Sequence, residues 1–108
     1  MLFREGSDAK LRIKLYDVQS GVILPVDLDD YDVIQLVIKF ADEKLLTVIG
    51  EPEENETYSI VDFSVYSENT KGKVGKCIAD VRGIKGSKKV RFNKKTLKGK
   101  VLSSVKVP

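Results

Sequence analysis

The chain has 108 residues, of which 42% are hydrophobic and 32% are charged, and its formal net charge is +3. A chain of this length and composition is typical of one globular domain with a modest core. One cysteine excludes an intramolecular disulfide, and the absence of histidine removes the commonest general base and the commonest zinc ligand.

Alternation of apolar and polar residues predicts β-strands along most of the chain. The clearest row is Ile34, Leu36, Ile38 and Phe40, and its partly apolar alternates predict a strand covered on both faces. The expected strands are Leu11–Asp17, Val22–Pro25, Ile34–Phe40, Leu45–Ile49, Tyr58–Tyr66, Lys76–Arg82, Val90–Phe92 and Val101–Val107.

Turn residues separate these strands and favour a sandwich. The expected connections are Ser20-Gly21, the glycine-free Ala41–Lys44, the acidic loop Glu51–Glu56, the polar loop Ser67–Gly75, Gly83–Gly86 and Lys98-Gly99. About seven to eight short strands with turns at this spacing predict an all-β, antiparallel β-sandwich over residues 1–108, and a small barrel is the alternative. No membrane helix and no signal peptide are expected, so we expect synthesis in the cytosol.

Four carboxylates lie within six residues at Asp27, Asp29, Asp30 and Asp32. A calcium loop needs alternating oxygen ligands, a glycine at the sharp turn and a distant glutamate, and this segment lacks the glycine. We interpret it as a polar turn whose aspartates cap backbone donors, with an ion site as the alternative.

Other candidate sites favour structural roles. Cys77 has the same phase as Ala79 and Val81, so we expect it to pack inward. Gly72–Cys77 lacks the spacing of a phosphate-binding loop, and the carboxylate pair Glu53-Glu54 lies in an acidic loop without signs of a pocket. We therefore predict that the protein is not an enzyme and has no cofactor and no metal.

The charges are divided sharply along the chain. Residues 81–108 contain ten basic side chains and no acidic one, so residues 1–80 hold nine basic and all sixteen acidic side chains. The formal charge is thus −7 before Val81 and +10 from there on. The candidate partner-binding residues are Lys85, Lys88, Lys89, Arg91, Lys94, Lys95, Lys98 and Lys100.

Three interpretations of this basic segment, residues 82–108, remain open. It is a solvated edge that resists aggregation, a nucleic-acid site over residues 82–100, or a docking surface for an acidic protein, including another copy of the chain. Lysine outnumbers arginine in this segment, and Phe92 is its one aromatic residue and shares the phase of Val90, which points to the core. Because nucleic-acid sites favour arginine and stacking aromatics, these features favour a protein partner.

Two short motifs resemble a phage structural module. Pro25, Asp27-Leu28, Asp29-Asp30 and Tyr31 lead into the strand Ile34–Phe40, and Gly75–Val81 fits the pattern Gly-x-Tyr-x-Ala-x-Val with Cys77 at the aromatic position. In these motifs, residues 9–82 resemble the N-terminal immunoglobulin-like domain of phage baseplate upper proteins and related tail and fibre-anchoring domains.

The resemblance implies an immunoglobulin-like sandwich that serves as a non-catalytic virion component in a tail, baseplate, collar or fibre anchor. It would be made in the host cytoplasm, assemble into the virion, and contact other virion proteins or copies of itself. A small nucleic-acid-binding β-barrel is the alternative function.

Overall fold

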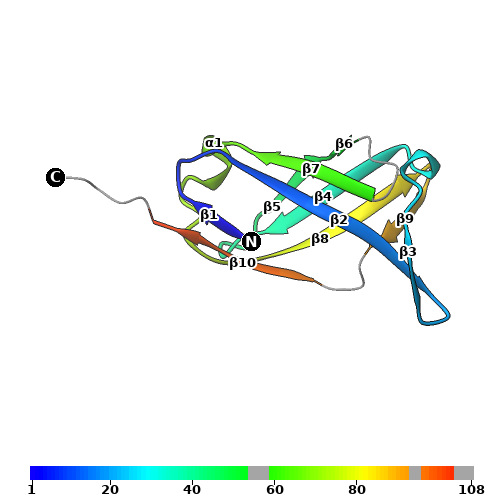
Figure 1. The fold of residues 1–108 in the computed structure, drawn as a ribbon. Coiled ribbons are helices and arrows are strands. Elements are labelled where there is room, and N and C mark those ends of the chain that lie inside the picture. Colours follow the sequence, from blue (N-terminus) through cyan, green and yellow to red (C-terminus); the bar gives the residue numbers. More distant parts are fainter. Residues whose placement is uncertain (54–58, 93–95, 104–108) are drawn as a thin grey trace.

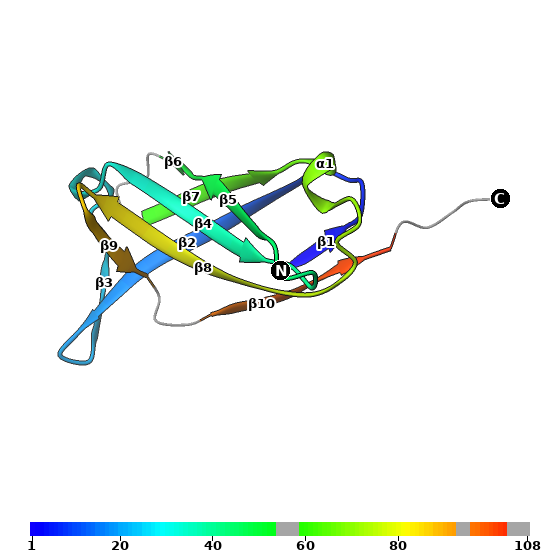
Figure 2. The same cartoon turned by 180° about the vertical axis from the view of Figure 1, so that it is seen from behind.

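The computed structural model describes residues 1–53, 59–92 and 96–103, and it shows two β-sheets packed face to face (Figures 1 and 2). The strands are β1 (Leu2–Arg4), β2 (Ala9–Gln19), β3 (Val22–Pro25), β4 (Val33–Lys39), β5 (Leu45–Ile49), β6 (Glu51–Glu53), β7 (Ser59–Val65), β8 (Gly75–Lys85), β9 (Lys88–Arg91) and β10 (Leu97–Leu102). A 3₁₀ helix, η1 (Leu28–Asp30), precedes β4, and a short helix, α1 (Ser67–Thr70), follows β7. The predicted all-β sandwich is confirmed.

The larger sheet has six strands in the order β1-β10-β8-β4-β5, with β9 also paired to β8. Strand β8 is long enough for two partners along one edge: β10 pairs with Gly75–Ala79, and β9 pairs with Arg82–Lys85. Strand β4 occupies the opposite edge of β8. All pairs are antiparallel except β1 and β10, which run parallel.

The smaller sheet has the order β3-β2-β7-β6. Its β2–β3 hairpin extends beyond the body of the sandwich (Figure 1). The predicted turn at Ser20-Gly21 joins these strands, and both residues have positive φ, at 51° and 77°. This conformation matches the twist of paired strands and suits a two-residue hairpin.

One glycine carries the chain from the larger sheet to the smaller one. Strand β5 ends at Ile49 in the larger sheet, Gly50 follows, and β6 begins at Glu51 in the smaller sheet. The Gly50 N–H donates to the Ile34 carbonyl at 2.8 Å, so the crossing point stays attached to β4. A Cβ at this position would meet the side chains of Val61 and Phe63, which explains the need for glycine.

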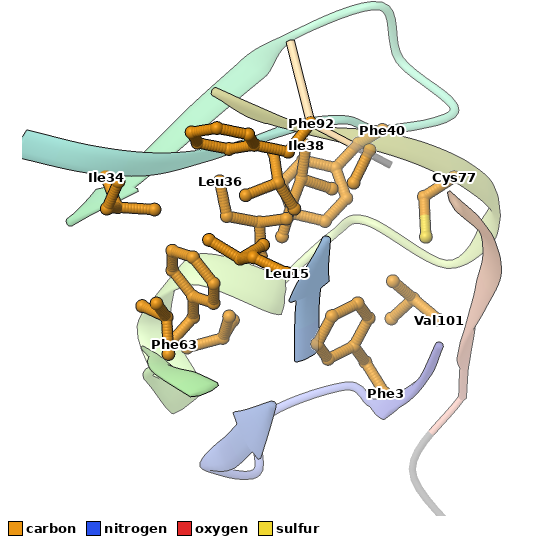
Figure 3. Close-up of a cluster of buried hydrophobic side chains, with 14 of the residues drawn as sticks. Phe3, Leu15, Ile34, Leu36, Ile38, Phe40, Phe63, Cys77, Phe92 and Val101 are labelled. Atoms are coloured by element: carbon orange, nitrogen blue, oxygen red, sulfur yellow. The ribbon is translucent and has the colours of Figure 1, made fainter. Parts of the chain in front are cut away.

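The core lies between the sheets and is built from the inward rows of both (Figure 3). Strand β4 contributes Ile34, Leu36 and Ile38, as its alternation predicted. Its outward alternates are only partly buried and lie under no third layer of the described chain, so the expected cover on both faces is not found. The buried hydrophobic residues are Phe3, Leu15, Val26, Ile34, Leu36, Ile38, Phe40, Val61, Phe63, Val65, Cys77, Ala79, Val81, Phe92 and Val101.

Several local expectations differ from the structure. Ten strands are described rather than seven or eight, because no strand was predicted at β1 and the residues of β6 were predicted to be part of a loop. Gly83 and Lys98-Gly99 lie within strands rather than turns, and Ser67–Thr70 forms a helical turn. The expected loop Glu51–Glu56 and the expected strands Tyr58–Tyr66 and Val101–Val107 each include residues that lie outside the described part of the chain, at 54–58 and 104–108. No helix of the described part has the length and apolar character to cross a membrane.

Candidate functional site

The outer surface of the six-stranded sheet carries most of the basic residues of its strands. Because Cys77, Ala79 and Val81 of β8 are buried, their neighbours Lys76 and Arg82 point outward. The strand register extends this alternation across the sheet. The outward basic residues, here called the basic face, are Arg4, Lys39, Lys76, Arg82, Lys89, Arg91, Lys98 and Lys100.

Asp80 is the single acidic residue on the outward positions of these strands. Its Oδ1 lies 3.0 Å from Arg91 Nη2 and its Oδ2 lies 3.9 Å from Arg82 Nη2, so one carboxylate serves two guanidinium groups. The Arg91 contact is an ion pair without hydrogen-bond geometry, and Arg91 Nη2 donates instead to Thr96 Oγ1 at 2.6 Å. Asp80 therefore neutralises only part of the local positive charge.

The lysines of the basic face are mostly uncompensated. Lys39 pairs with Glu43, with Nζ 2.7 Å from Oε2. Among the described residues, Lys76, Lys98 and Lys100 have no ion pair. Since these three lie on the adjacent strands β8 and β10, their like charges add and create a positive potential over this part of the sheet.

Apolar side chains lie between the charges, and aromatic ones do not. Leu2, Ile78 and Leu102 are exposed on the outward positions beside Lys98 and Lys100. None of the described outward positions in these strands holds Phe or Tyr. The face therefore offers charge and aliphatic contact area but no stacking platform for bases.

Strand β9, which carries Lys89 and Arg91, is held in place by the residue that follows it. The Phe92 side chain is buried, and its N–H donates to the Val81 carbonyl at 2.9 Å. Its ring packs edge-to-face on Tyr31, with centroids 5.1 Å apart. The inward orientation predicted for Phe92 is confirmed, whereas Val90, of the same phase, is exposed because it lies at the sheet edge.

The predicted partner-binding residues separate into three groups. Lys89, Arg91, Lys98 and Lys100 share the basic face. Lys85 and Lys88 are paired across the tip of the β8–β9 hairpin, and Lys94 and Lys95 lie outside the described residues. Sequence reasoning missed Arg4, Lys39, Lys76 and Arg82 as members, although the alternation beside the buried rows already marks Lys39 and Lys76 as outward-facing.

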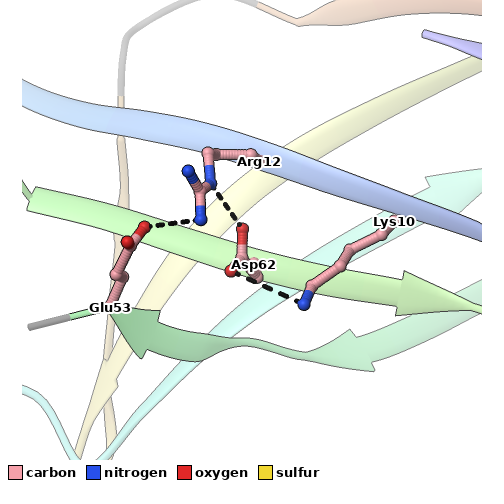
Figure 4. Close-up of polar contacts among 4 residues, drawn as sticks. All are labelled: Lys10, Arg12, Glu53 and Asp62. Carbon is pink, nitrogen blue, oxygen red and sulfur yellow. Dashed lines mark hydrogen bonds and ion pairs between the residues drawn. The ribbon is translucent and has the colours of Figure 1, made fainter.

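The outer surface of the smaller sheet is different, because its charges neutralise one another (Figure 4). Arg12 donates from Nε to Asp62 Oδ1 at 3.1 Å, and its Nη2 lies 2.7 Å from Glu53 Oε2. The hydrogen bond that Arg12 donates to Asp62, with the charges of Asp62 and Glu53, raises the pKa of Arg12. Lys10 lies 3.9 Å from the other Asp62 oxygen. Glu53, expected in a loop, thus belongs to β6 and to this ion-pair network.

The other candidate residues take structural positions. Asp27 Oδ1 accepts from the Asp29 N–H at 3.1 Å, and Asp32 Oδ2 accepts from the Gly86 N–H at 2.9 Å, which fits the capping interpretation. Among the described residues, no group of three acidic or cysteine side chains is arranged to hold a metal ion. Cys77 is buried, and desolvation raises the pKa of its thiol.

The structure also contains a shallow groove of about 250 Å³ between β5 and the end of β7. Leu46, Val48, Ser64 and Tyr66 are among its lining residues, and Glu51 is the one carboxylate that the described part of the chain places there. This groove lies away from Lys98 and Lys100, because β5 and β10 are separated by β4 and β8. It forms a second feature of the surface, with polar and apolar side chains in its lining.

The basic face combines uncompensated ammonium groups with aliphatic side chains on a rigid sheet. This combination suits contact with an acidic surface of another macromolecule, since charge provides attraction and aliphatic groups provide area to bury. Comparisons with protein-family models, with curated proteins and with solved structures found no match to this chain.

Proposed function

We propose that this protein is a non-catalytic structural or adaptor component of a phage virion and that its basic face binds an acidic protein surface during assembly. The observation that carries the binding part is the basic face, where Asp80 is the single acidic residue among outward lysines and arginines. The phage part depends on the resemblance at Pro25–Tyr31 and Gly75–Val81. The protein would be made in the host cytoplasm and act within the particle.

A protein partner fits this face better than a single-stranded nucleic acid does. Leu2, Ile78 and Leu102 supply aliphatic area on the outward positions, and no aromatic ring accompanies them there. Arg82 and Arg91, which could contact phosphates in bidentate fashion, are already engaged by Asp80. The remaining cations are lysines, which act as point charges toward carboxylates and phosphates alike.

Nucleic-acid binding is the second candidate, and the observation that favours it is the same excess of positive charge on Lys76, Lys98 and Lys100. Binding of this kind depends steeply on salt, because phosphate contacts release counterions. The two functions are therefore separated by comparing probes of each class.

The test uses fluorescence anisotropy with two labelled probes: a peptide of alternating glutamate and leucine, and a DNA oligonucleotide of equal net charge. The variant carries Lys89→Glu, Lys98→Glu and Lys100→Glu, which leaves the Arg91–Asp80 pair intact. The matched control carries Lys10→Glu, Lys14→Glu and Lys71→Glu, an equal charge change away from the basic face.

We expect the wild-type chain and the control to bind the peptide, and the basic-face variant to bind at least tenfold more weakly. Equal weakening in both variants would show that net charge alone matters and would contradict a specific face. Tight DNA binding with a steep salt dependence, together with weak peptide binding, would select the nucleic-acid function. For the phage part, capsid, portal or tail genes beside the coding sequence would support the proposal, and their absence would count against it.

A further inference from the structure

Strand β5 forms one edge of the six-stranded sheet, and β4 is its single strand partner among the described residues. The phase of this pairing is fixed at both ends, where Gly50 donates to the Ile34 carbonyl and Phe40 donates to the Lys44 carbonyl. In an antiparallel pair, hydrogen bonds to one neighbour alternate along the strand. The N–H and C=O groups of Leu45, Thr47 and Ile49 therefore point away from β4.

The other described edges carry features that discourage pairing with another chain. Strand β3 ends in Pro25, and β6 contains Pro52 between two glutamates. Strand β9 (Lys88–Arg91) is mostly basic, and β1 has only three residues. By contrast, β5 reads Leu-Leu-Thr-Val-Ile, with no charge and no proline. Because proline and lysine are the usual protections of an edge, β5 is the unprotected one among these five strands.

Exposed aliphatic side chains border this edge on one side of the sheet, and a groove of mixed polar and apolar lining borders it on the other. On the outer side, Leu45 is 67% exposed and Ile49 is 57% exposed. On the inner side, the edge borders the groove of about 250 Å³ lined by Leu46, Val48 and Tyr66. A strand added to β5 would cover the two exposed side chains and close this groove.

We propose that β5 pairs antiparallel with β5 of a second copy of the chain, about a two-fold axis at Thr47. This pairing rests on the proposed assembly function and names one of its contacts. Thr47 would face Thr47 of the second copy, and Leu45 would face its Ile49. In this register every outward N–H and C=O of the three residues finds a counterpart, and both outer pairs join two exposed aliphatic side chains.

The register is also free of opposed charges. Lys44 would face Gly50 of the second copy, which has no side chain. A two-fold axis generates each contact twice, so a like-charge pair in this register would have occurred twice. A five-residue strand pair is smaller than a standard stable interface, so we expect a weak dimer with a Kd of roughly micromolar to millimolar that strengthens when other contacts hold the copies together.

Single cysteines test the register directly in a Cys77→Ala background, since Cys77 is the one natural cysteine. Directly opposed residues of a hydrogen-bonded antiparallel pair have Cα atoms about 5.5 Å apart, which a disulfide can span. Thr47→Cys should therefore form a disulfide-linked dimer under mild oxidation. Leu45→Cys should not, because four residues of strand separate its two copies by about 13 Å.

An equimolar mixture of the Leu45→Cys chain and the Ile49→Cys chain should give the mixed disulfide. The two variants have equal mass, so one of them is labelled with heavy nitrogen to distinguish the mixed dimer by mass. We expect Thr47→Cys to cross-link at least tenfold faster than Leu45→Cys, and Thr47→Pro in the unmodified chain to lower the dimer fraction in sedimentation at high concentration. Proline at this position removes an outward N–H and spares the bonds to β4.

Equal cross-linking rates, faster cross-linking of Leu45→Cys, or a monomer at about 1 mM would each overturn the β5 pairing. The peptide-binding test of the basic face does not involve β5, so the two proposals fail separately. If the wild-type chain does not bind the peptide but Thr47→Cys cross-links, the proposed function is rejected. If the wild-type chain binds the peptide but Thr47→Cys does not cross-link, only the β5 dimer is rejected.

Discussion

Replacing Gly50 by alanine tests the point at which the chain passes between the two sheets. A Cβ built on Gly50 would lie 2.3 Å from Val61 Cγ1 and 2.7 Å from Phe63 Cε1. Both neighbours belong to β7, and both are completely buried, so neither can rotate into free space. The backbone at the crossing would have to move, and the hydrogen bond from Gly50 to Ile34 would be strained.

The expected cost follows from these contacts. Overpacking of a closed core costs about 1–3 kcal/mol, and two contacts below van der Waals distance place Gly50→Ala near the upper end, at about 3 kcal/mol. Alanine also makes the unfolded chain less flexible than glycine does, which stabilises the folded state by about 0.4–1 kcal/mol. The net destabilisation is therefore about 2 kcal/mol, a large share of the roughly 5–15 kcal/mol typical of whole proteins.

Urea denaturation followed by far-ultraviolet circular dichroism measures this change, since the chain has no tryptophan to report by fluorescence. Gly72→Ala is the matched control, because Gly72 has a positive φ of 71° but nothing within 4 Å of its Cβ position. The control should lose about 1 kcal/mol through backbone strain alone. A smaller loss for Gly50→Ala than for Gly72→Ala would refute the steric reasoning.

Three further predictions concern other parts of the fold. The hydrogen bond from Lys73 and the Lys44 N–H lower the pKa of Asp42; the wild type should therefore lose stability as pH falls below about 4, and Asp42→Asn should flatten this decline in melting temperature. Burial raises the pKa of Cys77, so Ellman's reagent should label it at pH 8 only when urea unfolds the chain, and rapid labelling without urea would contradict its burial. Phe92→Ala should cost about 3–5 kcal/mol in urea denaturation, whereas Val90→Ala, at an exposed site, should cost less than about 0.5 kcal/mol; equal losses would contradict the anchoring of β9 by Phe92.

The sequence predicted best the elements whose alternation is strong. Ile34–Phe40 and the row Cys77, Ala79 and Val81 are buried as expected, because one face of each strand must meet the core. Strand β6, with Glu51-Pro52-Glu53, was predicted to be a loop, since its composition disfavours strands. It is a strand because β7 supplies its partner, and that long-range pairing leaves no local signal.

Glycines misled the prediction for a similar reason. Gly83 and Gly99 suggest turns, yet both lie within strands where another group approaches closely: the rings of Phe92 and Tyr31 in one case, and the Met1 carbonyl in the other. The basic face was predictable only in part. Local alternation shows that Lys39 and Lys76 point outward. Their place on the same surface as Lys98 and Lys100 depends on which strands pair in one sheet, and the local sequence does not show that pairing.

The parallel pairing of β1 with β10 has a consequence for the order of folding. Lys98 and Lys100 bond through their backbones to Met1, which joins residues almost a hundred positions apart. Contacts of such separation form late, because the entropy of closing the loop is lost before the contact is gained. During synthesis the hairpins β4–β5 and β8–β9 can form as they emerge, whereas β1 must wait for β10. The potential of the basic face therefore develops late in the folding of these two sheets, after β10 has been synthesised.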